Sequence, residues 1–461
     1  MTRNKISILF SMLSFFYTSS AVFGQELKLE ELWTEVKQNY SGITPRDYAI
    51  EASQINETAT QGNRYPQVKV QAQNSYGSYE SSIGGFFPQA GFFNVNGTNN
   101  PLFGSDASFN TFGSALVEWE IFSFGRLKND VQVSKSMTGK KLSEKEAYLL
   151  SLKTQLSSRY IDFLYSYAHK AWNEKRTDRL KSIYEIANQL AASGLIASAD
   201  SLISLSAYTQ SLGRQENILG TIESAEIRLK ELYEFPDSKH SESLKSFMNS
   251  DLLLESENTI QINSSHPKLN LLTNQVEITE LQAEAERKTI FPSLRIMAGY
   301  AFRGSSIDIQ AAEVSGNYTD GFSNSSHNFL VGVGLTWDIS NFYTKRIKGE
   351  SLSKEAESVK SIHLNYEQAM QAELAAINAK IKQQKEALIK LKLGIQQSAD
   401  AFDMYFLRYE SGLIRLSDLL QVQLLVEDAE KNYIEALLEY WKLRVQYSEL
   451  TEDFDFLFRN L

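Results

Sequence analysis

The chain contains one motif twice, at a constant spacing. The sequence Ser-Gly-Leu-Ile at 193–196, followed by Asp200, returns at 411–414, followed by Asp418, which is an offset of 218 residues (411 minus 193). The same offset carries Trp119 onto Trp337 and the Glu-Leu pair at 231–232 onto 449–450. Because one shift aligns three separated sites, the sequence predicts an internal duplication, in which two copies of one structural unit together form the fold.

The first 24 residues have the features of an export signal. Arg3 and Lys5 precede a mostly apolar stretch, residues 6–17, that is too short to span a bilayer. Val22 and Gly24 are small residues at the −3 and −1 positions of a signal peptidase site before Gln25. We therefore expect residues 1–24 to be a signal peptide and the protein to be exported.

Composition excludes several classes of protein. The net charge is −10, and it becomes −12 (44 basic against 56 acidic residues) without the leader and its two basic residues, which argues against nucleic acid as a partner. The absence of cysteine excludes disulfides, thiol catalysis and a lipid-modified N-terminal cysteine. After the leader there is no run of ~20 apolar residues of the kind a membrane helix needs. A soluble exported protein or a β-barrel remains.

Two stretches predict long helices. No proline lies between 102 and 235 or after 292, and a proline inside a helix costs about 3 kcal/mol. Apolar residues recur at steps of three, four and seven from Leu149 and from Leu352, which is the stripe of a helix. A helix from roughly 127 to 192 would be about 100 Å long. Each Ser-Gly pair is a helix stop, and Asp200 or Asp418 can cap or open the returning helix. Each half therefore contains a long helical hairpin, and helices 28–62 and 266–289 precede the prolines at 66 and 292.

The period changes to two just after those prolines, which predicts four strands in two hairpins. In each of the ranges 68–72, 115–121, 294–302 and 329–339, every second residue is apolar. The residues between them, which would form the opposite face of the strand, are mostly polar or small. One apolar face, with aromatic residues near the strand ends, is typical of transmembrane barrel strands. We expect Lys69, Gln71, Gln73 and Glu118 to face the barrel lumen, and Val70, Val117, Trp119, Val331 and Trp337 to face lipid. The alternative, a soluble sandwich, is weakened because two hairpins make a poor core.

Four strands cannot close a membrane barrel, for which about eight is the lower limit. An open edge in lipid leaves backbone groups without partners, so the barrel must be shared between chains. A dimer would supply eight strands and a trimer twelve, and the strands themselves do not decide between them. The segment 79–110 is either an outward-facing loop with a small aromatic cluster or a lid over the pore mouth.

The expected organisation is a first repeat at 25–235, a linker at 236–265 and a second repeat at 266–461. The linker is rich in Ser and Glu and is expected to be a partly helical strap. No Gly-rich phosphate loop, nucleophile elbow or His-Glu pair on one helix is present, and the five histidines show no metal spacing. We expect no catalytic, cofactor-binding or metal-binding residues, and no enzyme.

Several motifs resemble those of a known family. They are Tyr65-Pro66 before the first strand, Trp-Glu-Ile-Phe-Ser-Phe-Gly-Arg at 119–126 with a weaker repeat at 337–346, and Arg-Tyr-Glu-Ser-Gly-Leu-Ile-Arg-Leu-Ser-Asp-Leu-Leu at 408–420. Together with the duplication, they resemble the TolC-type outer-membrane channels, the exit ducts of tripartite efflux and type I secretion systems. The second repeat departs at Asn341 and Tyr343, where the family usually has a tight Asp-Gly-Gly-like turn.

The resemblance implies a mixed α and β membrane protein of the bacterial outer membrane. It would be a homotrimer with a twelve-stranded β-barrel on a long α-helical periplasmic barrel. It would also be a passive duct, opened at its periplasmic tip by an adaptor (membrane fusion) protein and an inner-membrane pump. The resemblance places the two Ser-Gly turns at that tip, so the expected docking residues for the adaptor are Gly194, Leu195, Gly412, Leu413 and Arg415.

The resemblance also implies a gate near the tip. Polar links between neighbouring hairpins would involve Asp200 and Tyr409, and Asp418 matches an inward-facing ring of carboxylates. Gln421 stands where the family can carry a second acid, so the ring would be weaker. The plainer alternative is that the glycines and aspartates only cap helices. The alternative function is an exported coiled-coil structural or adhesive protein without a pore. The substrate, whether drug, metal or protein, is not determined by the sequence.

Overall fold

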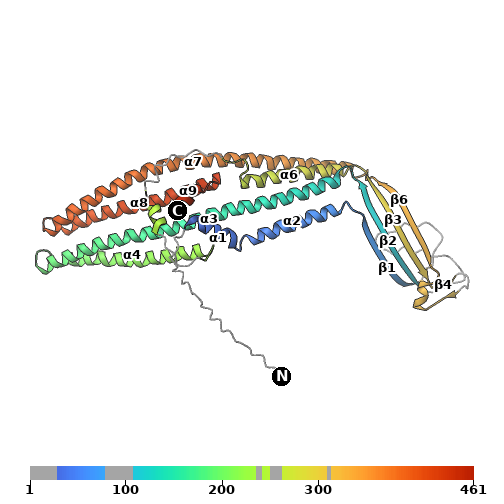
Figure 1. Cartoon of the computed structure of the whole chain (residues 1–461), viewed down its shortest axis with the longest axis horizontal. Helices are drawn as coiled ribbons and strands as arrows, with labels where there is room; N and C mark the ends of the chain where they lie inside the picture. Colours follow the sequence, from blue (N-terminus) through green and yellow to red (C-terminus); the bar gives the residue numbers. More distant parts are fainter. Residues whose placement is uncertain (1–27, 78–106, 235–240, 250–261, 309–312) are drawn as a thin grey trace, which may run out of the picture. The chain divides into compact units, whose positions relative to one another are not determined.

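The computed structural model describes residues 28–77, 107–234, 241–249, 262–308 and 313–461. The chain consists of two compact units. One unit comprises Gly42–Tyr148 with Ser264–Met370, and the other comprises the chain up to Ser41 with Leu149–Asn263 and Gln371–Leu461. Two long helices, α3 (Arg126–Ala192) and α7 (Phe342–Glu410), contribute residues to both units (Figure 1). The predicted leader, and the predicted loop 79–110 apart from its last four residues, lie outside the described residues.

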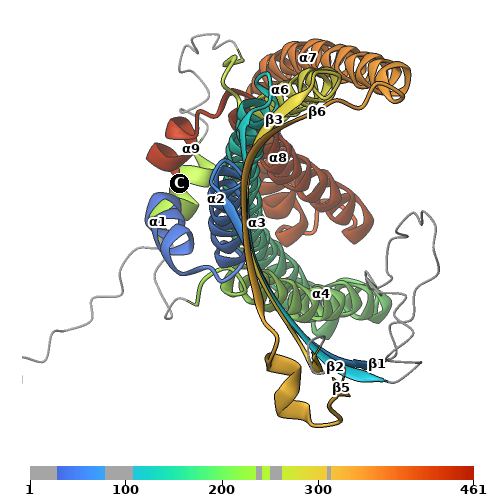
Figure 2. The ribbon, with the colours of Figure 1, turned by 90° about the vertical axis from the view of Figure 1, so that its right-hand side faces the viewer.

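The first unit contains a curved antiparallel sheet (Figure 2). Its strands are β1 (Gln67–Gly77), β2 (Ser108–Phe122), β3 (Ser293–Ser305) and β6 (Ser326–Thr336), in the spatial order β1-β2-β3-β6. The four predicted strands are therefore present, but the fourth was predicted too far along the chain. It ends at Thr336 because the Asp338 carboxylate accepts hydrogen bonds from the side chains of Ser340 (3.0 Å) and Asn341 (2.5 Å), which turns the chain into α7.

Short elements lie between β3 and β6. They are β4 (Ile307–Asp308), β5 (Glu313–Val314) and the 3₁₀ helix η2 (Tyr318–Phe322). β4 pairs with β5, and η2 packs against β2 and β3. The described part of the connection between β3 and β6 is thus folded, and η2 holds it against the sheet.

Helices precede β1 and β3, as predicted, but the predicted helix 28–62 is wrong in one respect. It is two helices, α1 (Leu29–Asn39) and α2 (Thr44–Gly62), separated by residues 40–43. Pro45 lies in the first turn of α2, where its missing N–H costs no hydrogen bond, whereas within a continuous helix it would break one. The helix before β3 is α6 (Pro267–Lys288), which also begins on a proline.

The second unit contains two helical hairpins, α3 with α4 (Ser198–Lys230) and α7 with α8 (Leu416–Thr451) (Figure 1). The long stretches without proline are helical over 67 and 69 residues in α3 and α7. An apolar cluster joins the hairpins near their turns, and its buried members are Leu180, Ile183, Ala187, Phe402, Tyr409, Leu416, Leu419 and Val426.

Short helices of the same unit pack against one another. They are α1, α5 (Ser241–Met248), which lies within the predicted linker 236–265 and also packs against α8, and α9 (Asp455–Asn460). The Trp441 indole donates to the Phe247 carbonyl at 3.1 Å, and the Lys153 ammonium lies 4.2 Å from the centre of the Phe454 ring. These contacts fix the second unit's core away from the hairpin turns.

Candidate functional site

The strand register sorts side chains onto two faces of the sheet. In an antiparallel pair, directly opposed residues share a face. Gln67 opposes Glu118, so Lys69, Gln71 and Gln73 lie on the same face as Glu118, and Lys69 forms an ion pair with Glu118 at 3.8 Å. The structure therefore brings together the four residues predicted to face the lumen.

The opposite face carries four of the five residues predicted to face lipid, namely Val70, Val117, Trp119 and Val331, whereas Trp337 follows the last residue of β6 and has no partner in the register. Val117 opposes Ala298, which opposes Val331, and Val70 opposes Ala115 on this same face. Val70 and Val331 are 79% and 71% exposed within the chain. This face is apolar and lies without cover over the middle of the sheet in the described part of the chain.

Trp119 and Trp337 make the same contact in the two repeats. The Trp119 indole N–H donates to the Arg64 carbonyl at 2.8 Å, and that of Trp337 donates to the Ile290 carbonyl at 3.0 Å. Each acceptor lies two residues before the proline that opens the hairpin, Pro66 or Pro292. Each tryptophan therefore links the end of the second strand of its hairpin to the residues that follow the helix preceding that hairpin.

A charged cluster lies where β2 ends and β3 begins, and the sequence did not predict it. Glu120 bridges Arg126 at 2.9 Å and Arg295 at 3.5 Å, and Arg126 also pairs with Asp130 at 3.2 Å. Burial raises the pKa of Asp130, and the charge of Arg126 opposes that rise. Arg126 belonged to a recognised motif, but nothing in the sequence indicates that Arg295 of the other repeat lies beside it.

Both Ser-Gly turns are the same helix stop. Gly194 and Gly412 have φ values of +71° and +69°, which favour glycine. In the first turn the Gly194 N–H bonds to the Ala191 carbonyl and the Leu195 N–H to the Leu190 carbonyl, which is the Schellman motif, and the second turn repeats this pattern from 408 to 413. Leu195 and Leu413 are each 72% exposed, and Arg415 is also exposed.

Neither predicted aspartate is an N-cap. α4 begins after Ala197 and α8 after Arg415, so Asp200 and Asp418 both lie at the third helical position. The Asp418 carboxylate accepts the Arg415 N–H at 3.3 Å, whereas the Asp200 side chain accepts no such bond from Ala197. Asp418 and Gln421 are both exposed on α8.

Tyr409 is buried in the apolar cluster near the turn. Its side chain is 1% exposed, and its hydroxyl has no hydrogen-bond partner among the described residues. Burial raises the pKa of the Tyr409 phenol, and the negative charge of Asp200 adds to the rise. The structure thus places Asp200 near Tyr409 within one chain without a hydrogen bond between them.

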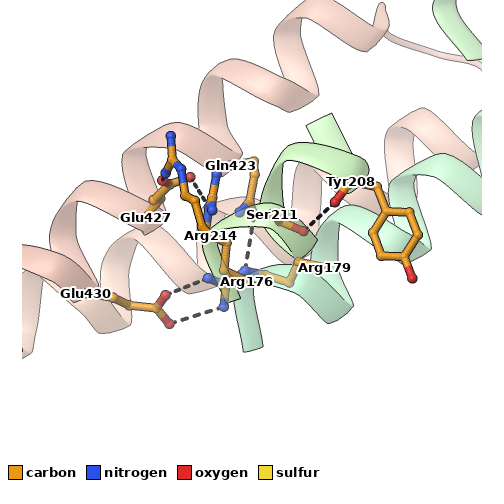
Figure 3. A network of polar contacts seen from close by, with 8 residues as sticks. All are labelled: Arg176, Arg179, Tyr208, Ser211, Arg214, Gln423, Glu427 and Glu430. Atoms are coloured by element: carbon orange, nitrogen blue, oxygen red, sulfur yellow. Dashed lines mark hydrogen bonds and ion pairs between the residues drawn. The ribbon is translucent and has the colours of Figure 1, made fainter. Parts of the chain in front are cut away.

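A buried charge network, also missed, connects the two hairpins (Figure 3). Arg176 of α3 pairs with Glu427 of α8 at 2.6 Å, with side chains 6% and 10% exposed, and Arg214 of α4 pairs with the same carboxylate at 2.9 Å. Arg179 forms a two-pronged bond to Glu430, at 3.1 and 2.5 Å, and donates to Gln423 at 3.1 Å. The Arg176 Nη1 has no hydrogen-bond partner in the described part of the chain.

The described residues contain no group of three or more metal-binding side chains, and none of their helices is long and apolar enough to cross a membrane. Two open hollows lie on the described surface, one of about 610 Å³ between α2, α3 and α6 and one of about 440 Å³ near Trp119.

Solved structures share this fold. VceC, an outer membrane protein from Vibrio cholerae, is 12% identical with a TM-score of 0.71, covering 92% of this chain and 95% of its own. The Campylobacter jejuni CmeC outer membrane channel is 14% identical with a TM-score of 0.70, covering 92% and 85%. The open state of the Neisseria gonorrhoeae MtrE outer membrane channel is 14% identical with a TM-score of 0.68, covering 92% and 88%.

A comparison with curated protein sequences finds no significant match. The family model described as outer membrane efflux protein matches residues 47–233 and 261–446, one match for each repeat. These ranges include all four strands of the sheet and both helical hairpins except the last five residues of α8, 447–451. The chain therefore belongs to the outer membrane efflux protein family, and its function is that of an outer-membrane channel rather than an enzyme.

Proposed function

We propose that three copies of this chain form one passive exit duct of a tripartite efflux or type I secretion system. The observation that carries the proposal is the sheet with two free edges. In the described part of the chain, β1 pairs with β2 alone and β6 with β3 alone. Unpaired edges are excluded from lipid, so β6 of one copy must pair with β1 of the next.

Three copies supply twelve strands, which leave a wider lumen than eight. In this arrangement Lys69, Gln71, Gln73 and Glu118 line the lumen, and Val70, Val117, Trp119, Val331 and Trp337 face lipid. The support is the register, which puts Val70, Val117, Trp119 and Val331 on the face opposite the polar set, and the exposure of Val70 and Val331. The helical hairpins then form the periplasmic tunnel, residues 1–24 are a removed leader, and 236–265 is a strap between the repeats at 25–235 and 266–461.

The hairpin turns are the proposed docking tip for a periplasmic adaptor, which couples the duct to an inner-membrane pump. Gly194, Leu195, Gly412, Leu413 and Arg415 form this tip, and the support is a pair of exposed turns with the same backbone conformation. Asp418, exposed near the turn, would form a carboxylate ring that attracts cations, with Gln421 contributing no charge. The substrate follows from the pump, whose identity lies outside this chain.

The competing function is an exported coiled-coil structural or adhesive protein without a pore. The exposed apolar face of the sheet argues against it, because a secreted protein would leave that face in water. Two measurements test the proposal: the native mass in mild detergent and conductance in a planar bilayer. A stable trimer that forms cation-preferring pores is expected. A monomer or dimer would exclude the trimer, and a trimer without conductance would favour the adhesive protein.

A further inference from the structure

The segment between β3 and β6 lies on a definite face of the sheet. We name residues 313–325 the flap. A Cβ atom added at Gly304 would lie 2.6 Å from the Gly321 carbonyl oxygen, and one added at Gly321 would lie 2.9 Å from Phe109 Cβ. Side chains alternate along a strand, so position 304 points the same way as Tyr300 and Phe302. The flap therefore covers the apolar face of the sheet and not the polar face.

Hydrogen bonds hold the flap in place. The Ser305 N–H donates to the Ser323 carbonyl at 2.9 Å, and the Ser315 N–H donates to the Ser306 carbonyl at 3.0 Å. The Asn324 side chain donates to the Ile307 carbonyl at 2.6 Å. The flap is thus fastened to the end of β3 and to the residues that follow it, at the end of the sheet away from the tryptophan contacts.

The flap completes an aromatic cluster. The ring of Phe109 lies 4.5 Å from that of Tyr76 and 5.8 Å from that of Tyr318, and the Tyr318 ring lies 6.0 Å from that of Phe322. Tyr318 and Phe322 remain 54% and 48% exposed. Four aromatic residues therefore gather at one end of the apolar face, two of them supplied by the flap.

The spacing of the two aromatic groups fits a bilayer. Trp119 and Phe109 lie on the same face of β2, ten residues apart. At ~3.4 Å per residue and a strand tilt of ~40°, their separation along the barrel axis is roughly 26 Å, which matches the apolar band of ≈ 25 Å in outer-membrane barrels. Aromatic residues concentrate at both membrane interfaces. The flap aromatics lie at the depth of the second interface.

A second copy of the chain does not account for these exposed rings. Further copies join at β1 and β6, the outer strands, whereas the flap packs on β2 and β3, the inner pair. A lid over the pore would contact the polar face, which the Gly304 contact excludes. A lipid surface is the partner that fits.

We propose that the flap is an interfacial anchor, whose Tyr318 and Phe322 rings lie in the lipid headgroup layer on the side opposite the helices. This inference rests on the proposed barrel orientation. It assigns to the segment a role in fixing the depth of the barrel in the membrane rather than in covering its mouth.

The chain has no cysteine, so single cysteines can carry spin labels in phosphatidylcholine vesicles without further changes. Thr319→Cys and Ser323→Cys test the flap, Val331→Cys tests the middle of the apolar face, and Ser193→Cys marks a tip in water. Collision with oxygen and with a water-soluble nickel chelate reports depth. We expect the flap labels to be less accessible to nickel than the label at 193 and shallower than that at 331. Flap labels as accessible to nickel as the tip label would overturn the anchor.

The label at 331 separates the two proposals. If it is lipid-exposed while the flap labels are aqueous, only the anchor fails; if it is aqueous, the barrel orientation fails. Gly304→Ala should displace the flap and shift the label at 323 toward water, whereas Gly316→Ala, with open space around its added Cβ, should not. If Gly304→Ala does not fold, Tyr318→Ser with Phe322→Ser must produce the same shift, and an unchanged depth would contradict the role of the rings.

Discussion

The two helical hairpins share their backbone design and differ in their charges. Both turns have the same Schellman hydrogen bonds and the same positive-φ glycine, 218 residues apart. The network side chains are not shared: at this offset Arg176 corresponds to Gly394, and Glu427 corresponds to Thr209. Arginines lie on the first hairpin and glutamates on the second. The duplicated features are those each hairpin needs to fold, and the divergent ones are those by which the hairpins recognise each other.

The largest expected effect on stability comes from the buried charge network, which the two hairpins do not share. Glu427→Gln leaves Arg176 buried without its counter-charge, and removing one partner of a buried pair costs about 3–5 kcal/mol. The free energy of unfolding of the helical unit, followed by circular dichroism in denaturant, should fall by that amount. The matched control is Glu185→Gln, whose exposed pair with Lys181 at 3.8 Å should contribute under ~1 kcal/mol. Equal losses for the two variants would mean that the network does not join the hairpins.

The next effect concerns the shared turns. Alanine at Gly194 or Gly412 must adopt a left-handed conformation that costs about 1–2 kcal/mol. We expect equal losses of unfolding free energy in the two variants. Gly213→Ala in α4, where no atom lies within 4 Å of the added Cβ, should instead stabilise by roughly 0.5–1 kcal/mol. If the two variants lose different amounts of unfolding free energy, the two turns are not energetically equivalent.

The duplicated tryptophans give a smaller effect. Trp119→Phe and Trp337→Phe each remove one hydrogen bond to a carbonyl, worth about 0.5–1.5 kcal/mol. Thermal unfolding of the assembled channel should record similar decreases. Trp119 is the more covered ring, so its loss should be the larger of the two. If Trp119→Phe leaves the unfolding temperature unchanged, the contact between the end of β2 and Arg64 depends on ring packing alone.

The smallest stability effect is expected at the tip. The Tyr409 hydroxyl has no partner in the described residues, so Tyr409→Phe should change the unfolding free energy by less than ~0.5 kcal/mol. If the hydroxyl instead links neighbouring copies through Asp200, Asp200→Ala with Tyr409→Phe should raise single-channel conductance. Asp418→Ala should weaken cation preference. A double variant that conducts like the parent would leave Asp200 with a local role in its helix.

The sequence was sufficient for features that are local or periodic. The two turns, the strands and the long helices follow from glycine, proline and alternation, and each is decided within a few residues. The Arg176–Glu427 pair joins positions 251 residues apart (427 minus 176) and has no counterpart in the other repeat, so neither spacing nor duplication indicates it. The flap was also unpredictable, because its position depends on Gly304 and Gly321 lying close together. The break at residues 40–43 was missed because the apolar pattern continues across it.

The β2–β3 pairing has a consequence for how copies of the chain meet. It joins the last strand of the first hairpin to the first strand of the second, and the proposed β6–β1 pairing between copies would join the same two kinds of strand. The offset of 218 relates β2 to β6, and the two prolines relate β3 to β1 by 226 (292 minus 66). Ala115 opposes Tyr300, so Val333 would oppose Asn74 of the next copy, again with both on the apolar face. In the proposed trimer, the β2–β3 pairing within each chain is thus the same kind of contact as the β6–β1 pairing between chains, and the barrel wall would be a quasi-sixfold array of a single hairpin.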